Sequence, residues 1–222
     1  MNDNKKLVLI GGGGHCKSVL DSAIRLGCFS EIVITDYAIP AGQTILGRKI
    51  VGNDEILLEL YAKGFRYAFV AMGSIESTDK RRAAFLRAER IGFSFPTIID
   101  SSAVVADSAF IGAGVYIGKN AVVNAEAVIG DMAIINTGAI IEHDCKVGKF
   151  THVAVGAVAC GNSEIGKDVF VGAKAVIIQG VKVGMKSIIG AGSIVLGDVV
   201  PNSVVVGIVR GSDNDNMNTM GR

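Results

Sequence analysis

The sequence predicts two domains: an α/β, Rossmann-like βαβ domain over residues 1–98 and a parallel β-helix over residues 99–208. A polar tail follows at residues 209–222. Strand-like apolar runs alternate with helix-like stretches in the first part. An unbroken six-residue repeat fills the second part. Nine of the ten leucines precede residue 98 and only Leu196 follows it, so the composition changes where the architecture is expected to change.

The overall composition excludes several classes of protein. Half of the 222 residues are apolar, yet every apolar run is far shorter than the roughly 18 residues of a membrane span. No basic-then-apolar signal segment opens the chain. The net charge of +1 gives no electrostatic case for a nucleic-acid or membrane partner. The four cysteines form no C-x-x-C pair, so we expect reduced thiols, no metal site and a cytoplasmic location.

The first domain is expected to be a short βαβ-type sheet. Its predicted strands are rich in Val, Ile and Leu on both faces, as buried parallel strands are. Its predicted helices have apolar residues at helical spacing, and the last two end at glycines. The strands are expected at residues 5–11, 31–36 and 66–73, and the helices at 15–26, 53–64 and 77–92. In such a sheet, ligands bind beyond the carboxyl ends of the strands.

A glycine turn joins the first strand to the first helix. Gly11 to Gly14 are followed by His15, at the start of the expected helix. The run nearly fits the dinucleotide fingerprint and the P-loop, but Cys16 stands where those motifs need Gly or Ala. Glycine N–H groups at a helix N-terminus favour an anionic group. The turn therefore either holds a phosphate-bearing ligand of another kind or makes only a tight strand-to-helix connection.

The six-residue repeat is the strongest signal in the chain. Stepping by six from Ile99 to Val195 meets seventeen aliphatic positions, sixteen of them Ile or Val, and Gly follows eight of them. Each hexad is expected to form a short strand and a turn, with one branched side chain pointing inward. Three hexads close a coil of 18 residues, which gives nearly six stacked coils. An ordinary sandwich is a poor alternative, because its turns recur irregularly every 8–12 residues.

The hexads resemble the left-handed β-helix of hexapeptide acyltransferases. The left hand comes from this resemblance, since parallel crossovers are usually right-handed. "IGGGGHCKSVLDSA" with "INTGAIIEHDCKVGKFTHVAVGAVACG" resembles the sialic acid O-acetyltransferase (NeuD/PglD-like) family of sugar acyltransferases, over residues 5 to 208. That family includes N-acetyltransferases of nucleotide-linked 4-amino sugars. The resemblance implies acetyl-CoA as donor, a nucleotide-sugar substrate, and a homotrimer with active sites between neighbouring β-helices.

The resemblance implies that the first domain holds the nucleotide sugar. The N–H groups of Gly13 and Gly14 would approach the diphosphate, and His15 would donate to a phosphate oxygen or to the sugar. Asp36 ends the second predicted strand, near the place for a ribose or base, or is a solvated strand end. The same crevice is expected to be lined by Gly73 and Ser74, at the end of the third predicted strand.

By resemblance, the chemistry lies in "NTGAIIEHDCKVGKFTH". His143 would be the general base that removes a proton from the sugar amine. Asp144 would orient its ring or raise its basicity, although strand geometry leaves open whether the two residues touch. Asn136 is expected to hold the substrate. His152 is expected on the cofactor side of the site, facing His143 of a neighbouring subunit, or it serves as a trimer contact.

No charged motif in the sequence marks the binding site of the acetyl donor. By resemblance, CoA lies along the β-helix, where the matching positions are Gly161, Ala173, Gly190 and Ala191. The Gly161 N–H would contact the thioester oxygen, although each glycine could equally serve its hexad turn. The family often ends its β-helix with G-x-P-A-K, whereas this chain has "GIVRG" at residues 207–211, which puts a tail contact with the CoA adenosine in doubt.

The favoured function is acetyl-CoA-dependent N-acetylation of a UDP- or GDP-linked amino sugar. Within the same enzyme class, the alternative is O-acetylation of a sialic-acid-like sugar. A non-catalytic β-helix scaffold belongs to a different class, and the pair His143 and Asp144 argues against it. A β-helix carbonic anhydrase would need three metal-binding histidines in the β-helix, which has only two. The sequence does not reveal the nucleotide or the sugar.

Overall fold

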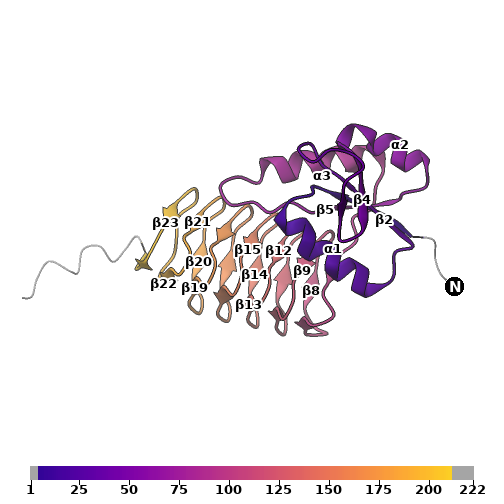
Figure 1. The fold of residues 1–222 in the computed structure, drawn as a ribbon. Coiled ribbons are helices and arrows are strands. Elements are labelled where there is room, and N and C mark those ends of the chain that lie inside the picture. The colour runs from indigo at the N-terminus through magenta and orange to yellow at the C-terminus, as the bar shows by residue number, and fades with distance from the viewer. Residues whose placement is uncertain (1–4, 212–222) are drawn as a thin grey trace, which may run out of the picture.

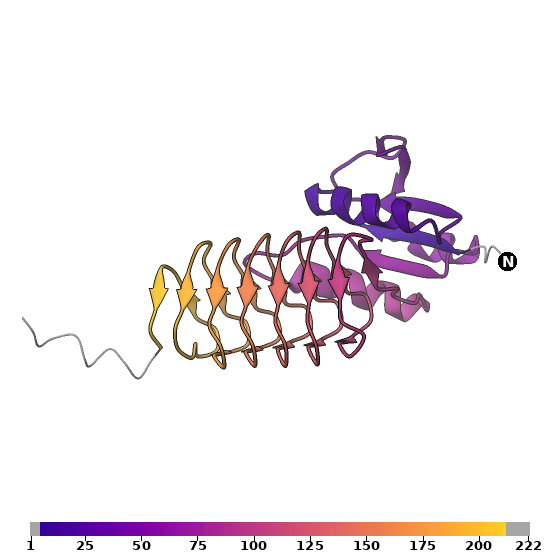
Figure 2. The same ribbon diagram turned by 90° about the horizontal axis from the view of Figure 1, so that it is seen from below.

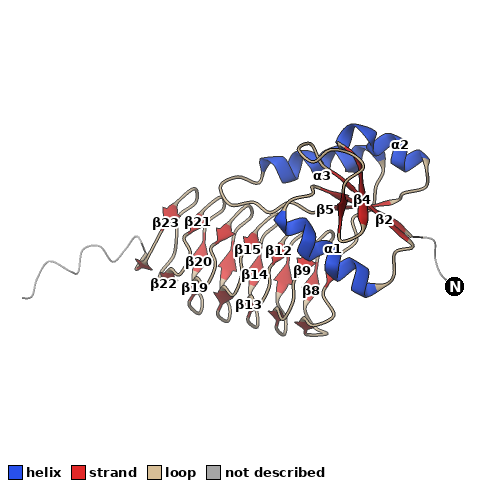
Figure 3. Ribbon diagram, viewed as in Figure 1, coloured by secondary structure: helices blue, strands red, loops and turns tan. Residues whose placement is uncertain are grey.

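The computed structural model describes residues 5–211, so most of the predicted polar tail lies outside the described residues. The N-terminal domain covers the first coils of the β-helix, which extends away from it (Figures 1 and 2). All helices of the described chain belong to the N-terminal domain, and short stacked strands make up the rest (Figure 3). The two architectures predicted from the sequence are therefore both present.

The sheet of the first domain has five strands in the order β3-β4-β2-β1-β5. The three predicted strands are β1 (Lys6–Ile10), β2 (Glu31–Thr35) and β5 (Tyr67–Val70), and β1 lies between β2 and β5 and is parallel to both. The prediction missed the hairpin of β3 (Thr44–Ile45) and β4 (Arg48–Gly52). Its turn places Leu46 and Gly47 at φ 45° and 74°, and leucine is not a residue that signals such a turn.

The helices begin and end close to the predicted limits. Helix α1 (Gly14–Leu26) begins one residue earlier than predicted. Helix α3 (Asp79–Ile91) is capped at its C-terminus by Gly92, which has φ 107°. The second predicted helix is a 3-10 turn, η1 (Asp54–Ile56), that leads into the short helix α2 (Leu57–Ala62). The Asn53 side chain caps this turn by accepting the N–H of Glu55. This cap fixes the position of Asp54 beside the end of β2.

The β-helix has three faces, each a stack of parallel strands. The face that packs on the N-terminal domain is called the interdomain face, and the face whose outward residues are all Val or Ile is called the aliphatic face. The interdomain face consists of β6 (Ile98–Ile99), β9 (Tyr116–Ile117), β12 (Ile134–Ile135), β15 (His152–Val153), β18 (Phe170–Val171), β21 (Ile188–Ile189) and β23 (Val204–Val205). The aliphatic face consists of β7 (Val104–Val105), β10 (Val122–Val123), β13 (Ile140–Ile141), β16 (Val158–Ala159), β19 (Val176–Ile177), β22 (Ile194–Val195) and β24 (Ile208–Val209). The third face consists of β8 (Phe110–Ile111), β11 (Val128–Ile129), β14 (Lys146–Val147), β17 (Glu164–Ile165) and β20 (Lys182–Val183).

The repeat positions counted from Ile99 are the second residues of these strands, and they fill the interior. Successive coils pair with an offset of 18 residues, as the hexads predict. The offset then falls to 16 where Ile188 pairs with Val204, and to 14 where Ile194 pairs with Ile208. The last coil is therefore shorter than the others, and its final strand ends at Val209, one residue past the predicted limit.

Apolar packing and a buried arginine join the two domains. Leu7, Val19 and Leu20 belong to the same buried cluster as Tyr116 and Ile134 of the interdomain face. Arg81 of α3 is 2% exposed, and its guanidinium donates to the carbonyls of Met132 and Phe150 in the β-helix. These contacts hold the loop between β5 and α3 against the interdomain face. That loop contains Gly73 and Ser74, which thus lie beyond the end of β5 rather than on it.

Candidate active site

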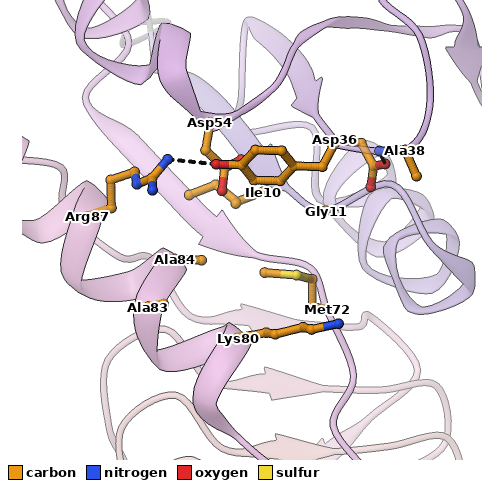
Figure 4. A pocket seen from close by; sticks show the side chains of 11 residues that line it. Ile10, Gly11, Asp36, Ala38, Asp54, Met72, Lys80, Ala83, Ala84 and Arg87 are labelled. Atoms are coloured by element: carbon orange, nitrogen blue, oxygen red, sulfur yellow. Dashed lines mark hydrogen bonds between the residues drawn. The ribbon is translucent and has the colours of Figure 1, made fainter.

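A cavity of about 500 Å³ opens beyond the carboxyl ends of β1 and β2 (Figure 4). One side of it is α3, which contributes Lys80, Ala83, Ala84 and Arg87 at the spacing of one helix face. The remaining walls come from the strand ends and the loops that follow them. They are lined by Ile10, Gly11, Asp36, Tyr37, Ala38, Asp54 and Met72. The cavity lies beyond the strand ends, where the sequence predicted a ligand crevice, and of the glycine turn only Gly11 lines it. Among the residues predicted to line that crevice, Asp36 lines the cavity, whereas Gly73 and Ser74 do not.

The four glycines of the turn differ in what the fold requires of them. Gly11 has φ 102°, and a Cβ on it would lie 2.4 Å from Met72 Cγ, so the fold itself requires glycine there. A Cβ on Gly12 would crowd Asp36 and Ile39. At Gly13 and Gly14 a Cβ would meet nothing within 4 Å, and both residues are exposed. The fold therefore does not explain the glycines at 13 and 14, which leave the N-terminus of α1 open.

Asp36 serves its own loop. Its carboxylate accepts the N–H of Gly12 at 2.6 Å, of Ala38 at 2.7 Å and of Ile39 at 2.9 Å. Burial raises the pKa of this carboxyl, but the three N–H bonds outweigh that effect and hold the pKa below its usual value. Asp36 lines the cavity and fixes the glycine turn beside it. It is thus more than the solvated strand end of the alternative interpretation.

Two histidines meet between the domains. The rings of His15 and His152 lie 6.1 Å apart, centroid to centroid. His152 Nδ1 lies 2.9 Å from the Ser74 carbonyl, which can only accept, so Nδ1 carries the proton. Its Nε2 then accepts from Asn136 Nδ2 at 3.3 Å. The structure thus brings together five residues predicted for the site, the fifth being Gly73, whose Cβ position lies 3.6 Å from the His152 ring.

Both of these histidines are neutral. Burial lowers the pKa of His15 to about 3 and that of His152 to about 4, and the charge of Arg81 acts in the same direction. The Nε2 atom of His15 is buried and has no hydrogen-bond partner within residues 5–211. A neutral ring with a free nitrogen can exchange one hydrogen bond with a ligand, but it supplies no positive charge.

His143 and Asp144 form a pair in the turn between β13 and β14. His143 Nδ1 lies 2.8 Å from Asp144 Oδ2, and the two side chains are 57% and 56% exposed. Asp144 has φ 60°, because it belongs to a turn and not to a strand, and this conformation brings the neighbouring side chains together. The hydrogen bond that His143 donates to Asp144 raises the pKa of the imidazole. The carboxylate binds the protonated Nδ1 and leaves Nε2 free to act as a base.

Gly161 lies directly against this pair, one coil further along. A Cβ on Gly161 would lie 2.7 Å from both Cε1 and Nε2 of His143, so the absence of a side chain makes room for the ring. The equivalent N–H of His143 is bound by the Glu142 side chain, and that of Ala125 by the Asn124 side chain. Cys160 precedes Gly161 and offers no such acceptor, and the Gly161 N–H makes no hydrogen bond within the described chain. A free donor therefore lies beside the imidazole.

The other predicted CoA positions lie at the opposite edge of the aliphatic face. Ala173, Gly190 and Ala191 follow β18 and β21, between the interdomain and aliphatic faces, whereas His143 and Gly161 lie between the aliphatic and third faces. A Cβ on Gly190 would lie 2.6 Å from Val206, so coil stacking also accounts for this glycine. Within one chain, the predicted residues thus fall into separate groups on either side of the aliphatic face.

Sequence reasoning missed several residues of the cavity and of the domain junction. Asp54, Met72, Lys80, Arg81 and Arg87 were not expected at the site. Among them, Lys80 and Arg87 follow the helical spacing of one α3 face, and this signal could have found them. Within residues 5–211, no group of three or more His, Cys, Asp or Glu side chains is arranged to hold a metal ion. None of the helices described is long and apolar enough to cross a bilayer.

Comparison with known proteins identifies the family. Residues 6–83 match the PglD N-terminal domain, and residues 164–196 match the hexapeptide repeat of succinyl-transferase. A histidine-to-alanine variant of GDP-perosamine N-acetyltransferase from Caulobacter crescentus, solved with CoA and GDP-perosamine, is 35% identical to this chain with a TM-score of 0.86. The alignment covers 91% of this chain and 93% of that one. The chain belongs to the NeuD/PglD family of sugar acetyltransferases.

Other solved structures agree with the NeuD/PglD assignment. The acetyltransferase domain of PglB from Neisseria gonorrhoeae, in complex with acetyl coenzyme A, is 34% identical, with a TM-score of 0.86 and coverage of 92% of this chain and 97% of that one. WeeI from Acinetobacter baumannii, 22% identical with a TM-score of 0.81, has the same fold. No curated protein sequence matches the chain significantly. As a NeuD/PglD member, the chain is an acetyl-CoA-dependent sugar acetyltransferase with a left-handed β-helix.

Proposed function

We propose that this protein transfers the acetyl group of acetyl-CoA to the amine of a UDP- or GDP-linked amino sugar, with His143 as the general base. The amine nitrogen attacks the thioester carbonyl carbon, and the His143 imidazole takes a proton from that nitrogen. The C–S bond then breaks, and the CoA sulfur leaves as a thiol after receiving that proton from the His143 imidazolium. The products are the acetamido sugar and free CoA.

The observation that carries this proposal is the His143–Asp144 pair beside Gly161. Asp144 Oδ2 lies 2.8 Å from His143 Nδ1 and fixes the tautomer in which Nδ1 carries the proton and Nε2 is the free base. The hydrogen bond to Asp144 raises the pKa of His143 and so makes the imidazole a stronger base. The free N–H of Gly161 suits the negative charge that develops on the thioester oxygen. Base and oxyanion donor are thus neighbours, as one acyl-transfer centre requires.

The first domain would hold the nucleotide sugar. Gly13 and Gly14 are exposed residues at the start of α1, and N–H groups at a helix N-terminus suit a diphosphate. Beyond them, the cluster of His15, Ser74 and His152 offers neutral hydrogen-bonding groups, which suit the hydroxyls of a sugar. Lines of small residues at the β-helix edges, including Ala173 and Ala191, leave space for CoA.

A homotrimer would bring these groups together. The outward positions of the aliphatic face form an unbroken ladder of Val and Ile, of which Val104, Ile194 and Ile208 are the most exposed. Such a contiguous apolar face is typical of an interface between subunits. His143 lies at one edge of this face, and the predicted CoA positions Ala173 and Ala191 lie at the other. Packing three copies through this face would place one subunit's base beside its neighbour's CoA and sugar residues.

The reaction is tested by measuring CoA release and acetylated product with UDP- and GDP-linked amino sugars. The same sugars with a hydroxyl in place of the amine form the control, because O-acetylation is the alternative. His143→Ala is expected to lower kcat by about 10²–10⁴-fold, with little change in KM for either substrate. The variant must keep the oligomeric state and melting temperature of the wild type. A folded His143→Ala enzyme that retains more than about a tenth of wild-type kcat contradicts the proposed base.

The assembly is tested by sedimentation, which should give one species near three times the 23.0 kDa chain. Val158→Asp, on the aliphatic ladder, should dissociate the trimer and abolish activity, because it introduces a charge at an apolar interface. Val104 lies at the end of the ladder nearest the N-terminal domain, and Val104→Asp is the milder comparison. A stable and active monomer would contradict both the trimer and the shared site.

The four free thiols and the CoA substrate favour the cytoplasm as the location.

A further inference from the structure

We propose that the cavity beside α3 selects a guanine nucleotide, with Asp54 binding the Watson–Crick edge of the base. The inference deepens the proposed function and rests on it, because it names the nucleotide that carries the amino sugar. It follows from the position of the cavity, the one free oxygen of a buried carboxylate, and the groups opposite that carboxylate.

The cavity is continuous with the sugar and phosphate positions. Gly11 lines it and begins the glycine turn, so a diphosphate at Gly13 and Gly14 would be next to its mouth. Met72 lines it as well, and the next residue, Gly73, lies against the ring of His152 and the Cβ atom of His15. A nucleotide sugar can therefore extend from the cavity past the glycines to the histidine cluster, with its base in the cavity.

Asp54 presents an unused acceptor inside this cavity. It is 7% exposed, and Thr35 Oγ1 donates to its Oδ1 at 2.8 Å. Its other oxygen, Oδ2, accepts no hydrogen bond within residues 5–211. Burial raises the pKa of this carboxyl despite the bond from Thr35. A buried carboxylate with free acceptor sites is stabilised by a ligand that donates to it, and a carboxylate can accept two parallel donors.

Guanine is the common base that offers two such donors side by side. Its Watson–Crick edge carries N1–H and the N2 amino group, which match the two oxygens of one carboxylate. Uracil has a single donor between two carbonyls, and adenine and cytosine each place an acceptor beside their amino group. Asp54 would therefore accept two charge-assisted hydrogen bonds from guanine and at most one from the other bases.

The groups around Asp54 suit the rest of a purine. Arg87 lines the same cavity and donates through Nη1 to the Tyr37 hydroxyl at 2.7 Å, the dashed line in Figure 4, which leaves its other N–H groups for the acceptors O6 and N7. Tyr37 is 64% exposed and offers an aromatic face for stacking. Ala83 and Ala84 leave the α3 side of the cavity open, and the volume of about 500 Å³ admits a nucleoside.

The test is calorimetric titration of the full-length protein with GDP, IDP, UDP and xanthosine diphosphate. IDP differs from GDP only in lacking the N2 amino group, and xanthosine diphosphate places a carbonyl there. The wild type should bind GDP at least tenfold more tightly than each of the other three. This ranking needs no variant. Binding of IDP or UDP as tight as that of GDP would overturn the proposal.

For the variant Asp54→Asn, the proposal predicts a gain of affinity for xanthosine diphosphate. Its amide oxygen can still accept from Thr35, and its amino group would face the carbonyl of xanthine. The variant should lose at least tenfold in affinity for GDP and gain at least tenfold for xanthosine diphosphate. Its melting temperature and its Kd for CoA should equal those of the wild type. Loss of GDP binding without the gain for xanthosine diphosphate would overturn the reading of the base by Asp54.

The proposed function fails in a different way. If the wild type binds CoA but none of the four diphosphates, the proposed UDP- or GDP-linked substrate is wrong, and the base specificity with it. If the wild type acetylates UDP-linked and GDP-linked amino sugars with equal kcat/KM, the transfer reaction stands and the selection of guanine is refuted.

Discussion

Replacing Gly161 with alanine should damage catalysis by displacing His143 without damaging the fold. The new Cβ would lie 2.7 Å from Cε1 and Nε2 of the ring, whereas ordinary contact begins near 3.4 Å, so the ring must move by about 0.7 Å. The His143 side chain is 57% exposed and can move outward into solvent. The backbone of Gly161 does not have a positive φ, so alanine is not strained there.

The size of the effect follows from the sensitivity of proton transfer to geometry. A misplacement of 1 Å at a reacting group costs about 10²-fold in rate. A shift of about 0.7 Å should therefore lower kcat by about 10- to 100-fold, while the N–H of residue 161 remains available to the thioester oxygen. Steady-state kinetics with saturating acetyl-CoA measures this loss, and thermal unfolding checks that the melting temperature is unchanged.

A double-mutant cycle with His143→Ala decides the cause. When the imidazole is absent, the Gly161→Ala methyl has no ring to displace and should lower kcat by less than about twofold, so the two losses should not add. If Gly161→Ala costs the same factor in both backgrounds, the methyl obstructs the thioester instead. If it costs less than about twofold in the wild type, the contact with His143 has no catalytic consequence, and the displacement argument is refuted.

Three further outcomes are expected. Gly13→Val should raise KM for the nucleotide sugar and leave the melting temperature and the Kd for CoA unchanged, because its side chain would meet open space; equal loss of CoA affinity would make the turn structural. The proposed base His143 can act only when neutral, so kcat should fall as the pH drops through its pKa; Asp144→Asn replaces the carboxylate that raises this pKa by a neutral amide, and the acidic limb of the kcat profile should move to lower pH. If the acidic limb does not move, Asp144 does not raise the pKa of the catalytic base. Arg81→Met leaves the carbonyls of Met132 and Phe150 without donors and should lower the free energy of unfolding by about 1–3 kcal/mol in urea denaturation, whereas equal stability would show that Arg81 does not join the domains.

The sequence predicted the β-helix closely, because sixteen of the seventeen inward repeat positions are Ile or Val, which stack on counterparts 18 residues away. The predictions failed where the backbone adopts a conformation that its residue does not signal. Leu46 occupies a positive-φ turn, so the β3–β4 hairpin was missed. Asp144 likewise has φ 60°, and strand geometry alone could not tell that it contacts His143.

The site was harder to predict than the fold, because its parts come from distant segments. Ser74 and His152 are 78 residues apart, and it is the packing of the two domains, including that of α3 through Arg81, that brings their loop and strand together. The sequence suggested a role for each residue by resemblance but not their contact. The cavity residue Asp54 gave no signal at all, because a single acidic residue at a helix start most often serves as a cap.

The coverage of the β-helix by the N-terminal domain implies a gradient of local stability along the coils. The N-terminal domain contacts the β-helix at Tyr116, Ile134 and Phe150. Through Arg82 and Thr78 it also contacts Asp168. Coils beyond that point are held within one chain only by stacking on the coil before them, so in an isolated chain opening should start at the shortened last coil and proceed inward. The coils that carry His143 and Gly161 lie within the covered part. Fraying of the far end would therefore leave these two residues of the proposed site in place, and insertions or deletions there should be tolerated better than any near the middle of the repeat.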